Sequence, residues 1–372
     1  MTRTCVALVL MSNVIMPASA RAQDLFQLSP LFSTAQEYDS NLFFAPVDRQ
    51  ADFVTRVSPG LESAYRSPGL TMVGRFTFDV ERFASHSELT TVDARQRAGA
   101  TVTYRPTQRL AVAADAELLK TRTPAELNAL TNVTLARARA QRASAHASVT
   151  RQLDIVTAGT MDYRYAADHI EGAPATRTHT LTIGADRHRS QRDVVSVNYR
   201  LNQFQFGATS ATSHAVDLGW THAITHRASV SLGGGPRVTG GSLAPDLSAS
   251  IRYQFQLGEW SLAYARTQTT VIGLAGVTDA QSLSATAAWL PRPSLRLRLS
   301  PAVFRSANTA LHADVYQLTA GIERRIARDV SLEVAVNLFR QHGNLYTASP
   351  DETIPRQNVV IRLVAAPATR PR

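Results

Sequence analysis

The chain has 372 residues, of which 44% are hydrophobic and only 18% are charged, with a formal net charge of +10. No run of about 18 apolar residues occurs in its body, which argues against a helical membrane protein. Arginine supplies nearly all the positive charge, and Lys120 is the only lysine. For an exported protein, we expect anionic lipid or an acidic polymer, rather than nucleic acid, as the counterpart of this charge. The arginines are spread along the chain and not clustered, so codon bias explains their number equally well.

The amino terminus has the pattern of a secretory signal peptide. Arg3 supplies the positive n-region, a mostly apolar stretch follows at 5–17, and small residues form a cleavage site at 18–20. We therefore predict a signal peptide over residues 1–22 and a mature chain over 23–372, with no separate soluble domain. Cys5 is the only cysteine, so the mature chain has no disulfide and depends on hydrogen bonding and burial.

Polar and apolar residues alternate along most of the mature chain. Met72 to Val80 shows the pattern, Leu181 to Leu201 repeats it on both sides of a polar turn at 190–193, and Leu247 to Phe255 and Leu332 to Leu338 repeat it again. A period of two is that of a β-strand with one apolar and one polar face. The chain is therefore predicted to be all-β and built from hairpins.

The spacing of turns predicts the number of strands. Eight short polar turns alternate with nine more variable connections, which join eighteen strands and put both ends of the chain on the short-turn side. Short turns on one side, longer loops on the other and an even strand number are typical of a transmembrane antiparallel β-barrel of the bacterial outer membrane. We predict about 18 strands, with centres at Ser33, Gly60, Phe76, Thr101, Ala114, Ala145, Met161, Thr182, Asn198, Leu218, Leu232, Ile251, Leu262, Ala285, Leu297, Leu318, Val334 and Ile361.

Aromatic residues on the apolar face favour a membrane barrel over a soluble sandwich. Tyr65 and Tyr104 come just before short turns, Trp260 follows one at 258–259, and Trp289 precedes another at 291–294. Such positions place aromatic rings at a membrane interface. A soluble multi-stranded β-protein stays open as the alternative, because many outward positions are alanine.

Two short motifs lie near the start of the mature chain. Residues 37–41 read Glu-Tyr-Asp-Ser-Asn at the end of the first predicted strand, and 58–61 read Ser-Pro-Gly-Leu in the second. Together they resemble a family of porin-like outer-membrane β-barrels that often accompany exopolysaccharide gene clusters. The resemblance is specific over about residues 30–66, and it implies a barrel for polysaccharide passage. The chain departs from many such barrels at its end, where residues 365–372 follow the last predicted strand in place of a terminal aromatic residue.

The polar faces carry charges of both signs that would line the lumen. They can set a transverse field that selects solutes, or they can neutralise one another as ladders that fill the lumen. Arg296 and Arg298 stand two residues apart near the turn at 291–294, and we expect them to attract anions there. The lumen-lining candidates are Arg75, Arg164, Arg200, Arg252, Arg296, Arg298, Asp79, Glu81 and Glu323, with Arg56, Arg97, Arg362, Glu62, Asp115, Glu117, Asp162, Asp217 and Glu333 on the same faces.

No motif for catalysis or for a cofactor stands out. Residues 233–235 are three glycines without a following helix, so they predict a bend in a strand and not a phosphate loop. Ser144, His146 and Ser148 share one predicted lumen face and are the best hydrolase-like group. We expect no cofactor and no metal site.

These patterns lead to one functional expectation and two alternatives. We expect a non-enzymatic, porin-like conduit in contact with outer-membrane lipid and lipopolysaccharide, with a polysaccharide or another polar solute as its cargo. The connection at 121–134 is the longest in the first half and is expected to narrow the lumen by folding inward. The alternatives are a structural or surface-interaction barrel without a conducting pore and an outer-membrane hydrolase. The sequence does not indicate an oligomeric state.

Overall fold

The structure, a computed structural model, describes residues 26–308, 312–344 and 351–366. The predicted signal peptide over 1–22 lies outside the described residues. Within them the regular structure is all strand, apart from two short 3₁₀ turns, η1 at Ser87–Leu89 and η2 at Pro124–Leu127. The strands are β1 Phe26–Asp39, β2 Asp52–Ser67, β3 Leu70–Phe83, β4 Thr91–Thr107, β5 Leu110–Thr121, β6 Ala140–Gln152, β7 Thr157–Ile170, β8 Thr176–His188, β9 Asp193–Phe206, β10 Thr209–Ala223, β11 Ala228–Thr239, β12 Ser242–Phe255, β13 Gly258–Thr270, β14 Val277–Arg292, β15 Leu295–Ala307, β16 His312–Ala327, β17 Val330–Asn344 and β18 Glu352–Ala365.

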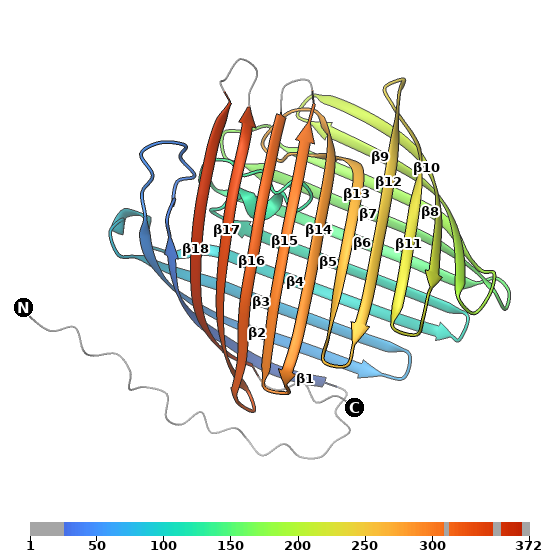
Figure 1. The fold of residues 1–372 in the computed structure, drawn as a ribbon, viewed down its shortest axis with the longest axis horizontal. Coiled ribbons are helices and arrows are strands. Elements are labelled where there is room, and N and C mark those ends of the chain that lie inside the picture. Colours follow the sequence, from blue (N-terminus) through green and yellow to red (C-terminus); the bar gives the residue numbers. More distant parts are fainter. Residues whose placement is uncertain (1–25, 309–311, 345–350, 367–372) are drawn as a thin grey trace, which may run out of the picture.

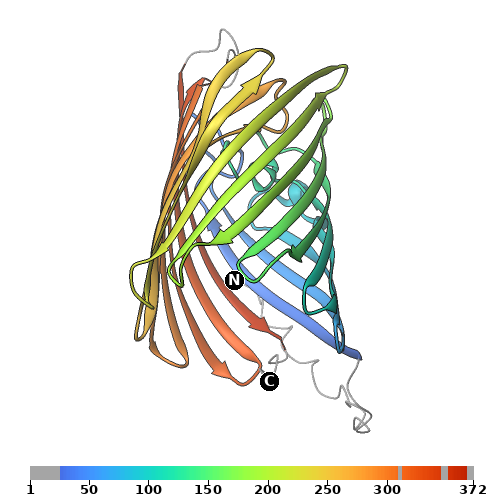
Figure 2. The same ribbon diagram turned by 90° about the vertical axis from the view of Figure 1, so that its right-hand side faces the viewer.

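The eighteen strands form one closed antiparallel barrel. Each strand pairs with its neighbours in the sequence, and β1 pairs with both β2 and β18, so the sheet has no free end (Figure 1). A view turned by 90° shows the strands running at a tilt around the barrel (Figure 2), as closure of a sheet requires. All eighteen predicted centres fall inside strands, so the predicted fold class is confirmed. No helix among the described residues is long and apolar enough to cross a membrane.

Alternation gives the barrel an apolar outside and a polar inside. Leu61 and Phe76 lie opposite one another on the outside and are each more than 40% exposed. One residue further along, Glu62 and Arg75 face one another in the lumen. Exposed apolar side chains of this kind cover the exterior of the barrel, and a surface so apolar needs lipid around it.

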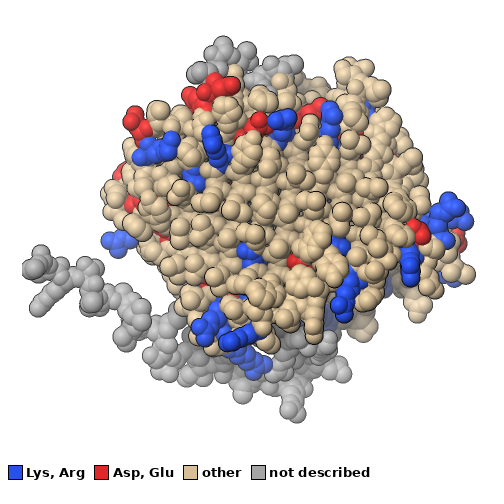
Figure 3. All heavy atoms as spheres, viewed as in Figure 1, with Lys and Arg blue, Asp and Glu red and all other residues tan. Residues whose placement is uncertain are grey.

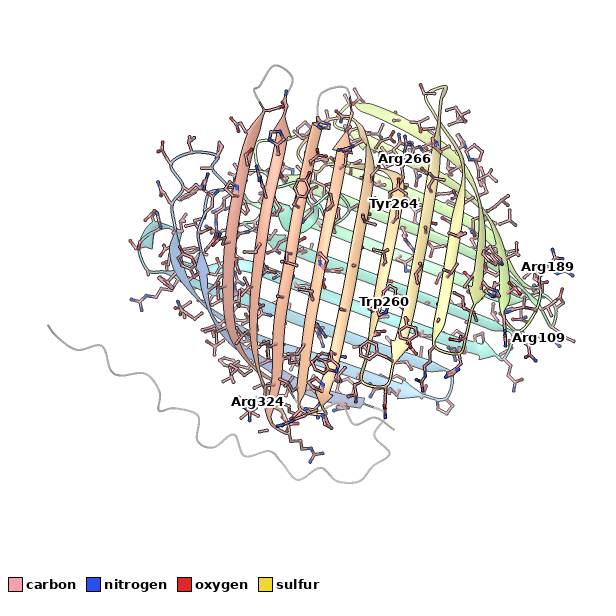
Figure 4. All side chains as sticks on the ribbon, in the orientation of Figure 1. Arg109, Arg189, Trp260, Tyr264, Arg266 and Arg324 are labelled. Atoms are coloured by element: carbon pink, nitrogen blue, oxygen red, sulfur yellow. The ribbon has the colours of Figure 1, made fainter. Side chains whose placement is uncertain are left out.

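Aromatic residues form a girdle at each end of the outer surface. The girdle at the short-turn end was predicted from the sequence, and Trp260 in Figure 4 lies in the lower part of β13 as expected. The girdle at the loop end was not predicted, because only the aromatic residues beside the short turns were considered in the sequence. Rings at both interfaces fit a barrel embedded in the bacterial outer membrane. The short-turn girdle includes Tyr104, Trp220, Trp260 and Trp289, and the loop-end girdle includes Tyr38, Phe53, Tyr165 and Tyr316.

Two predicted loops were wrong, and the reason is the glycine content of the turns. The Gly, Ser, Thr and Pro residues of 207–212 and 240–245 predict a loop over each segment, but the connections are only 207–208 and 240–241. Gly207, Gly240 and Gly241 have positive φ values of 57°, 55° and 84°, which suit tight hairpin turns. The Ser, Thr, Ala and Pro residues after them continue as strand. One short turn was also misplaced, since it lies at 256–257 and Gly258 begins β13.

The seam between the first and last strands is fixed by side chains as well as by backbone. Strands β1 and β18 pair from Phe32↔Ala365 to Asp39↔Asn358, so the closing strand forms despite the tail that follows it. Arg356 on β18 donates to both carboxylate oxygens of Asp39, at 2.9 and 2.6 Å. Asp39 is only 1% exposed, so its charge depends on this partner.

Replacing Arg356 with alanine should destabilise the barrel by about 3 kcal/mol, because it leaves a buried carboxylate without its cation. The temperature at which gel mobility shifts from the folded to the unfolded form would fall. Arg305→Ala is the matched control, since Arg305 also pairs with an aspartate, Asp314 at 2.9 Å, but is exposed. The control should barely move the midpoint. Equal shifts for both variants would contradict a special role for the seam.

Candidate functional site: the lumen and its constriction loop

A long connection between β5 and β6, residues 122–139, folds into the barrel, and we call it the constriction loop. Asn132 donates to Gln317 of β16 at 2.6 Å, and the backbone N–H of Thr134 donates to Gln341 of β17 at 2.7 Å. Gln341 also donates to the carbonyl of Thr134 at 3.2 Å. Strands β4, β3, β2, β1 and β18 separate β5 from β17 along the wall, so the loop crosses the lumen. These contacts place it inward, as the sequence predicted for 121–134.

The connection between β13 and β14, residues 271–276, meets the constriction loop from the other side. The backbone N–H of Ile272 donates to Asn128 at 2.8 Å, and Asn128 in turn donates to the carbonyl of Val133 at 3.0 Å. Asn128 is 3% exposed, so both hydrogen bonds are shielded from water and hold the loop firmly. Two small apolar clusters form around this contact: Val133 with Val271, Ala313 and Val315, and Leu127 and Leu135 with Leu119, Ala140, Ile170 and Ile272.

Ion pairs hold the constriction loop against the wall of β2–β4. Arg137 of the loop lies 3.2 Å from Glu81, and Glu126 lies 3.2 Å from Arg95. Arg56 joins the same group, since it binds Glu81 at 2.7 Å and lies 3.8 Å from Asp79. Asp79 and Glu81 are 7% and 6% exposed. These two predicted lumen residues therefore lie beneath the loop and not on the open wall.

Most of the other predicted lumen charges form cross-strand pairs on the wall. Arg200 is shared between Asp217 at 3.0 Å and Asp246 at 2.5 Å. These pairs match the neutralising ladders that the sequence left open as an alternative. The remaining cross-strand pairs are Arg75 with Glu62, Arg97 with Glu117, and Arg362 with Glu333, whereas Arg164 pairs with Asp162 of its own strand, β7.

Arg252, Arg296 and Arg298 differ from these residues. Arg296 stands directly across from Glu323 in the register of β15 and β16, and Arg298 stands across from Gly321. None of the three arginines has a carboxylate oxygen within 4.0 Å among residues 26–308, 312–344 and 351–366. They therefore leave net positive charge on the wall near the short-turn end.

The rim at the short-turn end is also basic. Figure 3 shows arginines along the lower edge with few acidic neighbours, whereas both signs mix along the upper edge. Figure 4 labels Arg109, Arg189 and Arg324 at this end. Asp154 is one of the few acids there, and a hydrogen bond from the backbone N–H of Val156 at 2.7 Å holds the pKa of its carboxyl below the usual range. The arginines of this rim include Arg66, Arg109, Arg151, Arg187, Arg189, Arg192, Arg227, Arg292, Arg324 and Arg328.

The hydrolase-like group does not assemble into a nucleophile and base. The Nδ1 atom of His146 lies 2.7 Å from Asp115, and its Nε2 atom lies 2.5 Å from Asp162. Both ring nitrogens are therefore engaged by carboxylates, and neither is placed to take a proton from Ser144 or Ser148. The described part of the chain also holds no group of three side chains suited to a metal ion.

One cluster of charges was missed from the sequence. Arg237 on β11 is 2% exposed and binds both Asp246 of β12, at 2.5 Å, and Asp279 of β14. Backbone pairing between β12 and β13 ends at Leu247↔Arg266. Between that point and the loop end, these side chains connect the hairpin β11–β12 with the hairpin β13–β14. Arg237 does follow the alternating pattern of β11. The link that Arg237 makes to β14 depends on Asp279, which lies 42 residues further along the chain, and the local sequence does not show it.

No family model and no curated protein sequence matches this chain. Solved outer-membrane barrels resemble it weakly. OpdO of Pseudomonas aeruginosa is 10% identical with a TM-score of 0.49, covering 91% of this chain and 97% of that one. OpdQ of the same organism is 9% identical with a TM-score of 0.47, covering 91% and 98%. The siderophore receptor PirA of Acinetobacter baumannii is 8% identical with a TM-score of 0.47, covering 91% and 80%.

Proposed function

We propose that this protein is a non-enzymatic conduit for polar solutes across the bacterial outer membrane, with an exopolysaccharide or its oligomers as the cargo. The observation that carries the proposal is the division of the wall into an apolar outside and an inside with polar and charged side chains along its length. An eighteen-stranded barrel is wide enough for an aqueous channel. The constriction loop would then set the size limit.

A swelling assay on liposomes tests this proposal. Vesicles that contain the purified barrel should swell in an isotonic solution of a small neutral sugar, and the rate should fall as sugars grow longer, because the constriction loop excludes them. Vesicles without protein supply the baseline. Swelling no faster than this baseline for every sugar would contradict the conduit.

A structural barrel without a conducting pore is the second candidate. It is favoured by the two apolar clusters and the hydrogen bonds that hold the constriction loop in place, since together they fill part of the loop end of the lumen. A filled barrel would give no swelling and no current. Both candidates place outer-membrane lipid and lipopolysaccharide around the barrel.

A further inference from the structure

The wall of β9–β13 contains a hollow of about 490 Å³. Its size lies within the range of small-molecule sites, roughly 300–1,000 Å³. Gly219 and Gly233 lie opposite one another in its lining, with Ser196 on one side and Ser248 on the other. A Cβ added at Gly233 would lie 2.7 Å from the hydroxyl of Ser248. The floor is therefore bare backbone with hydroxyl groups at its edges.

Two arginines at the hollow have donors to spare. Arg200 and Arg266 both line it, and the Nε of each is buried without a hydrogen-bond partner in the described part of the chain. The two side chains are also 26% and 29% exposed, so further N–H groups of each guanidinium are open to a ligand oxygen. Figure 4 shows Arg266 near the upper end of β13, where pairing with β12 stops.

The carboxylates beside these arginines restrict the kind of ligand. Asp217 and Asp246 also line the hollow and are bound to Arg200. With Arg237, Arg266 and Asp279 they form a network of three positive and three negative charges. A balanced network suits a ligand with one or two negative charges and disfavours a highly charged one. The free lone pairs of the aspartates and the serine hydroxyls suit a ligand rich in hydroxyl groups.

We propose that this hollow binds a carboxylated sugar unit of one or two rings. The carboxylate would accept hydrogen bonds from the accessible N–H groups at the tips of the Arg200 and Arg266 guanidiniums. Ring hydroxyls would bind Ser196, Ser248 and the aspartates, and the flat face of a ring would lie on the bare backbone at Gly233. The role of the site, to hold an acidic saccharide as it passes through the barrel, rests on the proposed conduit. Binding of the saccharide does not depend on conduction.

Calorimetry on the detergent-solubilised barrel tests the site directly, with digalacturonate as the acidic probe and maltose as the neutral one. Digalacturonate should bind at least ten times more tightly than maltose. In Gly233→Val combined with Ser248→Ala, the new side chain projects into the hollow from its floor, and the clash with the hydroxyl is removed. This variant should weaken digalacturonate at least tenfold.

Gly99→Val is the matched control. Gly99 faces the lumen from β4, and an added Cβ there would meet only the carbonyl of Ala116 at 3.6 Å, an ordinary contact. It should change the affinity less than twofold. Arg266→Gln supplies a test that does not depend on packing, because the carboxylate nearest to Arg266 lies 3.9 Å away and no short ion pair is lost. This variant should weaken the binding of digalacturonate but not that of maltose.

Equal affinity for the two sugars, or unchanged binding in Arg266→Gln, would overturn the site. The site would also be overturned if the variant with Gly233→Val and Ser248→Ala shifts on a gel when heated, as a folded barrel does, and binds digalacturonate as tightly as the wild type. Current in planar bilayers is measured on the same preparations. A barrel that binds digalacturonate but passes no current refutes the conduit and keeps the site, whereas one that conducts without selective binding does the reverse.

Discussion

Replacing residues 124–136 with a short Gly-Ser linker should raise single-channel conductance severalfold. The constriction loop crosses from β5 to hydrogen bonds on β16 and β17 and carries apolar side chains with it. Its removal would leave a lumen bounded by the strands alone, and barrels of eighteen strands have room for a wide aqueous channel. The cross-section of the barrel, and no longer the narrower passage left by the constriction loop, would then set the conductance.

The control for this variant is a linker of the same kind in place of residues 84–90, the connection between β3 and β4. That connection stays at the rim, where the backbone N–H of Ala84 donates to Phe53 at 3.0 Å. It should leave the conductance close to the wild-type value. If the two shortened barrels conduct alike, the constriction loop does not set the size of the passage.

Replacing Arg296 and Arg298 together with glutamine should shift the reversal potential toward cations at low salt. Both arginines lack a carboxylate within 4.0 Å among the residues that the structure describes, so their charge is not neutralised on the wall. Arginine stays charged at any working pH, and the preference should therefore persist across neutral pH. It should weaken in salt, because the screening length falls from about 30 Å at 0.01 M to about 3 Å at 1 M.

Reversal potentials in a tenfold salt gradient measure this change. Arg305→Gln is the control, since Arg305 lies on the outside of the barrel opposite Asp314 and should not affect the lumen. Barrel assembly should be intact in both variants. An unchanged potential in the double variant would mean that Glu323, directly across from Arg296, neutralises the pair in solution.

The alternating pattern was sufficient to predict the barrel, because a period of two is a local property that each strand carries in its own residues. Turn positions were less secure. At 240–241 two glycines allow a tight hairpin, and the Ser-Leu-Ala-Pro segment after them reads as a loop although it pairs as strand with β11. Whether such a segment forms a strand depends on its pairing with neighbouring strands, and the sequence of the segment alone does not show that pairing.

The inward course of the constriction loop was predictable from its length, but its partners were not. Asn132 and Gln317 are 185 residues apart, and neither stands in a local motif. For the same reason, Asp79 and Glu81 were read as open lumen residues from their face of β3, whereas both are buried and Arg137 of the loop binds Glu81. Which charges pair across the lumen depends on the strand register and on loop packing, which are properties of the closed barrel.

Single-channel recording in planar bilayers shows whether this barrel conducts. The purified, heat-modifiable protein should produce discrete current steps of uniform size as single barrels insert. These steps should become larger when residues 124–136 are replaced. Folded barrels that insert into the bilayer and yield no steps, with or without the constriction loop, would contradict the proposed conduit.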